Sequence, residues 1–188
     1  MTDVYIKEPP YNANDPEPGP PHSLADVRAW EEAKGAMLPE DYRSFITQYK
    51  GGTLYPALFL HRTEDPTGDF IQADEEEALD DLFHWSHVSR PQATDPTDVL
   101  WRHGLLGIGY DTSGSTICLS LREEDHGAVR WWWRNMASWD EEENGPRPIG
   151  TIAPSFRAFV FETLFEDGDD IPRWRIPADL QTAKQVSF

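Results

Sequence analysis

Residues 38–52 carry the signals of one complete helix and constrain the fold more than any other stretch of the chain. Pro39 suits the first helical position, because the N–H that proline lacks would be unpaired there in any case. Apolar side chains then recur at i, i+3, i+4 and i+7, and together they form one stripe: Tyr42, Phe45, Ile46 and Tyr49. Gly51 and Gly52 supply the left-handed residue at which many helices end. The pattern predicts an amphipathic helix that packs one face on a core.

The segments around this helix supply the other layers of such a core. Ser23 and Asp26 predict a capped helix that ends at Gly35. Residues 105–134 predict three antiparallel strands joined by short polar turns, and the apolar run at 53–61 predicts a further strand. A last helix, opened by Pro154, places four apolar side chains on one face: Phe156, Phe159, Val160 and Leu164. We therefore expect an α+β fold, with an antiparallel sheet of about five to six strands packed against two N-terminal helices and one C-terminal helix.

Several short motifs follow one another in an order that is typical of a known family. They are Trp30-Glu31, Gly35, Leu38-Pro39, Tyr42, Gly51-Gly52, the strand–turn–strand at 105–121 with Asp111 and Gly114 in its turn, and the Ser-Phe-x-x-Phe helix at 153–164. Together they cover residues 23–165 and resemble the SMI1/KNR4 (SUKH) superfamily. The resemblance implies an α+β domain. Because many bacterial members of that superfamily are immunity proteins, it also implies a protein that binds and blocks a toxin.

The length and the distribution of proline define three parts of the chain. At 188 residues it suits one domain. Proline-rich residues 1–22 predict an extended arm outside the core, 23–166 the SMI1/KNR4-like domain, and 167–188 an acidic tail that contains proline. The single cysteine, Cys118, excludes an internal disulfide and fits a reducing compartment. With no recognisable secretory signal and no membrane-spanning run, we expect a cytoplasmic protein.

Acidic residues dominate the charge of the chain and predict how it meets a partner. Thirty-four acids against sixteen bases give a net charge of −18, which disfavours nucleic acid as a ligand. Nine acids and no Lys or Arg occur at 64–81, where we expect a short acidic helix, and a second cluster follows at 140–143. The carboxylates that we expect to contact a basic protein are Asp74, Glu75, Glu76, Glu77, Asp80, Asp81, Asp140, Glu141, Glu142 and Glu143. The alternative is that these runs only solvate the surface.

The triplet at 131–133 offers aromatic contacts. In a strand, Trp131 and Trp133 share one face with Val129, and that face is expected to be core. Trp132 lies on the opposite face, where it is either covered or exposed as a binding anchor. Trp139 is the second uncharged candidate for such an anchor. Tryptophan is one of the residue types most enriched in interface hot spots.

Signs of enzyme chemistry are weak. Asp80, His84 and His87 fall at i, i+4 and i+7, so they would share a face if the segment were helical and could hold a metal. A solvated helix face is the competing interpretation. Cys118 lies among apolar residues of a strand, where a packed, inert thiol is expected. No phosphate-binding loop or nucleophile elbow occurs, so we expect no enzyme activity, no cofactor and no metal.

Two classes of function fit these observations best. The favoured one is an immunity protein that neutralises a cognate toxin with a basic surface, such as a nuclease or another effector that acts in the cytosol. The alternative is an intracellular scaffold or regulatory protein of the same family. A metal-dependent enzyme is the third. A single stoichiometric partner would favour the first class, several unrelated partners the second, and activity lost on chelation the third.

Overall fold

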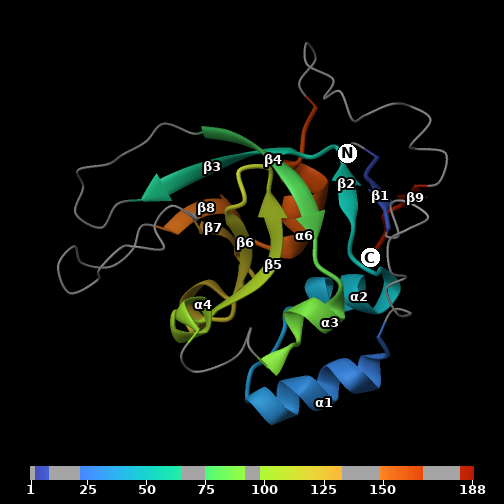
Figure 1. Cartoon of the computed structure of the whole chain (residues 1–188), viewed down its shortest axis with the longest axis vertical. Helices are drawn as coiled ribbons and strands as arrows, with labels where there is room; N and C mark the ends of the chain where they lie inside the picture. Colours follow the sequence, from blue (N-terminus) through green and yellow to red (C-terminus); the bar gives the residue numbers. More distant parts are fainter. Residues whose placement is uncertain (1–2, 9–21, 65–74, 92–97, 133–148, 167–182) are drawn as a thin grey trace.

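The structure is a computed structural model that describes residues 3–8, 22–64, 75–91, 98–132, 149–166 and 183–188. Six antiparallel strands close into a barrel in chain order (Figure 1). They are β3 (Leu58–Glu64), β4 (Glu75–Leu82), β5 (Leu105–Asp111), β6 (Thr116–Ser120), β7 (Val129–Trp132) and β8 (Ile149–Ala153). The predicted α+β class and the antiparallel sheet are confirmed. The sheet closes because β8 pairs back with β3, which gives each of these six strands a partner on both sides.

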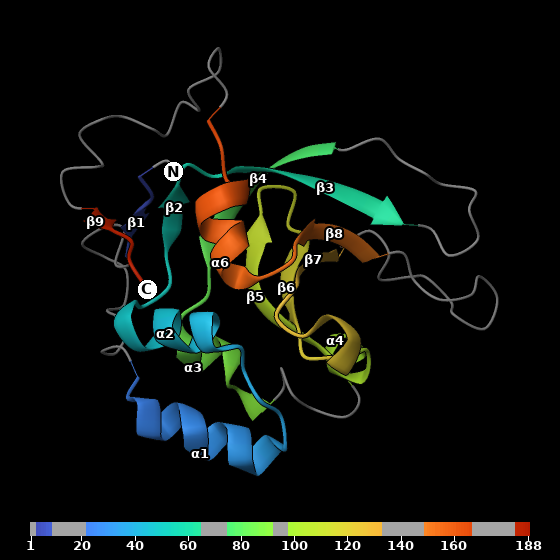
Figure 2. The same cartoon turned by 180° about the vertical axis from the view of Figure 1, so that it is seen from behind.

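The helices gather at one end of the barrel and against it. They are α1 (Leu24–Lys34), α2 (Glu40–Gln48), α3 (Trp85–Val88), α4 (Val99–Arg102) and α6 (Phe156–Ala158), which continues as a π-helical segment, Phe159–Thr163. The capping box of Ser23 with Asp26 is present, and α1 ends at Gly35 in the left-handed region, with φ 63°. Pro39 lies just outside α2, one position earlier than expected. Figure 2 shows α6 in front of the strands when the molecule is seen from behind.

An aromatic cluster joins α2 and α6 to the inner face of the barrel. Tyr42, Phe45, Phe156 and Phe159 are each at most 1% exposed. The Phe156 ring lies 5.0 Å from Tyr42 and 5.1 Å from Phe45, between ring centroids. The predicted apolar stripes of both helices are therefore confirmed. Trp30 of α1 lies at the margin instead and packs edge-on against Trp85 and Trp101.

The expected acidic helix near residue 80 is wrong, because β4 occupies that segment. Leu79 and Leu82 are both buried although three residues separate them, a spacing that looks helical. A β-bulge between Leu79 and Asp81 inserts one residue into the strand and turns both leucines inward. A bulge is a property of strand pairing, so the apolar spacing alone pointed to the wrong element.

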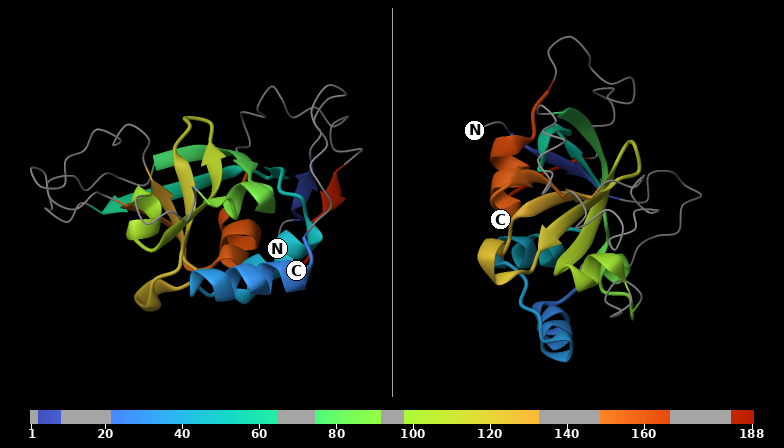
Figure 3. Two further views of the ribbon diagram at one scale, coloured as in Figure 1. Left: turned by 60° about the horizontal axis from the view of Figure 1, so that its bottom comes forward. Right: turned by 90° about the vertical axis from the view of Figure 1, so that its left-hand side faces the viewer.

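Segments of the expected arm and tail belong to the folded body. A second sheet has the order β2–β1–β9, with β1 (Tyr5–Lys7) between β2 (Thr53–Tyr55) and β9 (Lys184–Gln185). Figure 3 shows β1 and β9 side by side. Val4, Ile6 and Val186 are buried in the main core. The expectation that the whole arm lies outside the core is therefore wrong for these residues, because strand pairing across the chain was invisible in the local composition.

Candidate interaction surface

Strand β4 carries described members of the predicted acidic set on the outer face of the barrel. Glu76 and Asp80 are exposed, and Glu77 and Asp81 are half-buried. Glu77 pairs with Phe59, whose side chain is fully buried, so Glu77 lies on the inner face near the start of the strand. The structure thus divides the acidic run into outward and inward carboxylates.

Two exposed apolar side chains flank these carboxylates, and sequence reasoning missed both. Leu60 of β3 is 44% exposed and stands directly opposite Glu76. Tyr110 of β5 is 38% exposed and stands directly opposite Asp81. Directly opposed residues of antiparallel strands share a face, so β3, β4 and β5 present one surface on which apolar and acidic groups alternate. The signal that could have found them is the alternation of side chains along a strand: Leu60 follows Phe59 and Tyr110 precedes Asp111, and both of these neighbours are buried.

A short stack of rings extends this surface beyond β4. Tyr110 meets Phe83 edge-on, with ring centroids 4.6 Å apart, and Phe83 lies 4.5 Å from the ring of His87. Burial and the positive charge of Arg90 both lower the pKa of His87, so its imidazole is neutral at neutral pH. The region around Tyr110 is therefore an aromatic, uncharged margin next to the carboxylates of β4. We name the combined area formed by Leu60, Glu76, Asp80, Asp81 and Tyr110 the β4 surface.

Other predicted contact residues do not join the β4 surface. Trp132 is only 7% exposed, because it packs with Leu105 and Cys118 in a small cluster against which Val99 and Leu100 of α4 lie. The exposed-anchor interpretation of Trp132 is therefore corrected to the covered one. Glu75 is the first residue of β4 and stands opposite His61. The other predicted contacts lie outside the described residues: Asp74, Trp139, Asp140, Glu141, Glu142 and Glu143.

The candidate metal ligands do not share a helix. Asp80 belongs to β4, His84 caps the start of α3, and His87 lies within α3. The geometry assumed for a common face is therefore wrong. Within the described part of the chain, no group of three or more His, Cys, Asp or Glu side chains is placed to hold a metal ion. Cys118 is fully buried, and burial raises the pKa of its thiol, which favours the unreactive form.

Two buried carboxylates show what the family-like motifs do in the fold. Glu31 is 4% exposed, and its Oε1 accepts hydrogen bonds from Leu38 N at 2.7 Å and from Arg43 Nη2 at 2.8 Å. Asp111 is 1% exposed and accepts from Ser115 N and from Trp131 Nε1, both at 2.7 Å. Glu31 thereby joins α1 to α2, and Asp111 holds the β5–β6 turn against β7. These motif residues stabilise the framework, and the β4 surface lies elsewhere.

The family assignment rests on a match along most of the chain. The model of the SMI1 / KNR4 family (SUKH-1) matches residues 21–162. Searches of curated proteins and of solved structures each found no match. The family is not a recognised enzyme family, and its immunity-type members indicate a protein as the general kind of partner. Among the described residues, no helix has both the length and the apolar character needed to cross a membrane. The matched model and the residues that it spans show that this chain belongs to the SMI1/KNR4 (SUKH-1) family.

Proposed function

We propose that this protein is an immunity protein, which binds a cognate toxin through the β4 surface and blocks it. The observation that carries the proposal is the mixed character of this surface. Leu60 and Tyr110 expose apolar area on either side of Glu76, Asp80 and Asp81. A basic toxin surface that also offers apolar contacts is the complementary partner.

The two kinds of side chain would act at different stages of binding. Carboxylates attract a basic partner over a distance and raise the association rate, an effect that added salt weakens. Leu60 and Tyr110 would slow dissociation, because burying their apolar area is favourable only once the partner is docked. Both groups are borne by strands that are paired on two sides, so little ordering is needed when the partner binds. Occupation of a cationic cleft would block the toxin sterically and electrostatically.

Co-expression tests this proposal most directly. The probe is the toxin-like product of the neighbouring reading frame, produced together with the full chain. We expect a stoichiometric complex and restored growth of the producing cells. A protein that binds several unrelated partners and gives no protection would instead be the scaffold of the alternative interpretation.

Charge variants then locate the surface. Replacing Glu76 with Gln and Asp80 with Asn should slow association and flatten its dependence on salt, measured by stopped-flow mixing or surface plasmon resonance. Glu40→Gln with Glu162→Gln removes the same charge from exposed positions on α2 and next to α6, and should leave the rate near that of the parent. Leu60→Ser should chiefly raise the dissociation rate.

A second charge variant covers the other predicted cluster: Asp140, Glu141, Glu142 and Glu143 are replaced with Asn and Gln. If neither neutralised set changes the association rate at any ionic strength, the carboxylates only solvate the protein. Recognition would then use other residues, and the β4 surface would be rejected.

A further inference from the structure

Two segments that are distant in the sequence form a ridge, the α1–α2 link at 35–37 and the β6–β7 turn at 123–127. His126 Nε2 donates a hydrogen bond to the Met37 carbonyl oxygen, with 2.8 Å between the two atoms. Gly127, at φ 91°, lies so near Pro39 that a Cβ would stand 3.3 Å from Pro39 Cγ. Met37 is 64% exposed, more than any other large apolar side chain in the described residues. The ridge therefore presents an apolar side chain on backbone that is held by contacts from both segments.

An open hollow lies on each side of this ridge. One, of about 540 Å³, is bounded by α1 and α2 and has Arg28, Glu32 and Arg43 in its lining. The other, of about 570 Å³, lies between the β6–β7 turn and β8. Its apolar wall consists of Ala128, Ile152, Ala153 and Pro154. Glu123 and Glu124 lie along the same hollow and are exposed.

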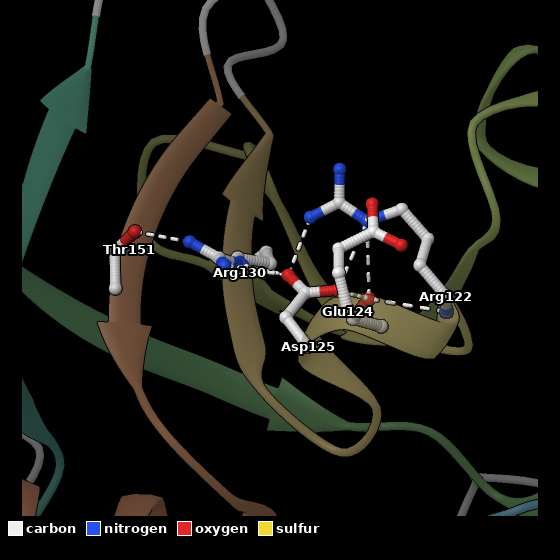
Figure 4. A network of polar contacts seen from close by, with 6 residues as sticks. Arg122, Glu124, Asp125, Arg130 and Thr151 are labelled. Atoms are coloured by element: carbon white, nitrogen blue, oxygen red, sulfur yellow. Dashed lines mark hydrogen bonds and ion pairs between the residues drawn. The ribbon is translucent and has the colours of Figure 1, made fainter.

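A polar network fixes the turn that carries these two glutamates. Arg122 and Arg130 approach Asp125 from two sides, and Arg130 also donates to Thr151 of β8 (Figure 4). Burial would raise the pKa of Asp125, but hydrogen bonds from Arg122, Ser120 and Arg130 and the charge of Arg122 outweigh it and lower the pKa to about 2. Asp125 is therefore ionised at neutral pH, and its single negative charge is paired with two guanidinium groups.

The net charge along the hollow is negative, because the three carboxylates of Glu123, Glu124 and Asp125 outnumber the guanidinium groups of Arg122 and Arg130. Glu123 makes no ion pair within the described residues, and Glu124 Oε1 lies 3.7 Å from Arg122 Nε at the surface. Asp125 is held between its two arginines, so Glu123 and Glu124 are the exposed carboxylates along the hollow that could pair with a cation from a partner. A lysine or arginine side chain has the matching shape, with an aliphatic stem for the apolar wall and a cationic head for the rim.

We propose that the hollow between the β6–β7 turn and β8 receives a lysine or arginine side chain of a protein partner, with Met37 packed beside it on the partner. The ridge is built from other elements than the β4 surface, so this contact can be tested separately from the toxin contact proposed for that surface. The turn is already fixed by the Asp125 network, so binding would cost little ordering of the backbone.

Nuclear magnetic resonance of the labelled full chain tests the hollow itself. The probe is Nα-acetyl-lysine N-methylamide, and the control probe is the norleucine analogue, which has an uncharged stem of similar length. We expect the lysine probe to shift the amide signals of Ala128, Thr151 and Ile152, and the norleucine probe to leave them in place. The shifts should disappear in Glu123→Gln with Glu124→Gln and persist in the charge-matched pair Glu40→Gln with Glu162→Gln. Absent shifts, or equal shifts with norleucine, would overturn the proposal.

Partner binding provides a second measurement with a separate outcome. If the co-expressed toxin binds the parent chain, Met37→Ser should weaken that binding about tenfold or more, as expected for an interface anchor. Unchanged affinity in Met37→Ser and in the Glu123/Glu124 variant would reject the ridge as the contact while leaving the immunity function standing. If the parent binds no toxin, the proposed function fails, and the lysine titration alone decides the hollow.

Discussion

At the scale of single residues, buried carboxylates set the geometry of this fold. Glu31 accepts hydrogen bonds from the backbone N–H of Leu38, just before α2, and from the guanidinium of Arg43 within α2, so one side chain ties both to α1. A charged residue is rarely buried unless it is paired in this way. The sequence marked Glu31 as part of a motif, but only the position of Arg43 twelve residues later explains its burial.

The first prediction concerns this ion pair. Glu31→Gln should lower the free energy of unfolding by about 1.5–3 kcal/mol, the range for a hydrogen bond to a charged group. The amide keeps an acceptor for Leu38 N but loses the charge that Arg43 requires. Glu32→Gln is the control, because Glu32 is the exposed neighbour of Glu31 and its substitution should shift stability by no more than about 0.5 kcal/mol. Equal urea midpoints for both variants would show that the Arg43 contact contributes nothing.

At the scale of elements, contacts between distant segments decide what the local pattern leaves open. The amphipathic helices were predictable because their 3.6-residue period is a property of the chain itself. The strand β4 was not, because its bulge exists only when β5 lies beside it. The same holds for β9, which has two residues and gains its place by pairing with β1.

The second prediction follows from β9 and the residues after it. Val186 is buried, and Phe188 packs against Phe45 and Phe156. Deleting residues 183–188 should lower the free energy of unfolding by about 2–4 kcal/mol, since fully burying one such side chain is worth about 1.5–3 kcal/mol. Ser187→Ala, at an exposed site in the same segment, should leave the denaturant midpoint unchanged. A deletion variant as stable as the parent would mean that this segment is only loosely attached.

At the scale of the whole molecule, the net charge of −18 works against compactness. Like charges repel more strongly in the folded state, and this repulsion is screened over about 10 Å at 0.1 M salt but over about 3 Å at 1 M. Some of the described carboxylates form ion pairs, which reduces this repulsion. Asp125, for example, lies between Arg122 and Arg130.

The third prediction is that salt stabilises the protein. Raising KCl from about 0.02 to 0.5 M should raise the melting temperature in calorimetry, because the screening of self-repulsion outweighs the weakening of exposed ion pairs. A variant with Glu76→Gln and Asp80→Asn should respond less, as it carries less charge to screen. A melting temperature that falls with KCl would indicate that the paired carboxylates dominate the balance.

Periodicity, capping residues and charge are local properties of the chain, so the helices α1, α2 and α6, the capping box of α1, the β5–β6–β7 meander and the acidic character of the surface could be predicted from the sequence. The ends of α2 could not, since Tyr49 ends this helix in an extended conformation before Gly51 and Gly52. Tertiary structure alone decided that the sheet closes, that Trp132 is covered by α4, and that Leu60 and Tyr110 flank the acids of β4. It also decided that Met37 and His126 meet at one ridge. These features depend on which segments lie side by side, and that is fixed by the joint burial of apolar faces from the whole chain rather than by any one stretch.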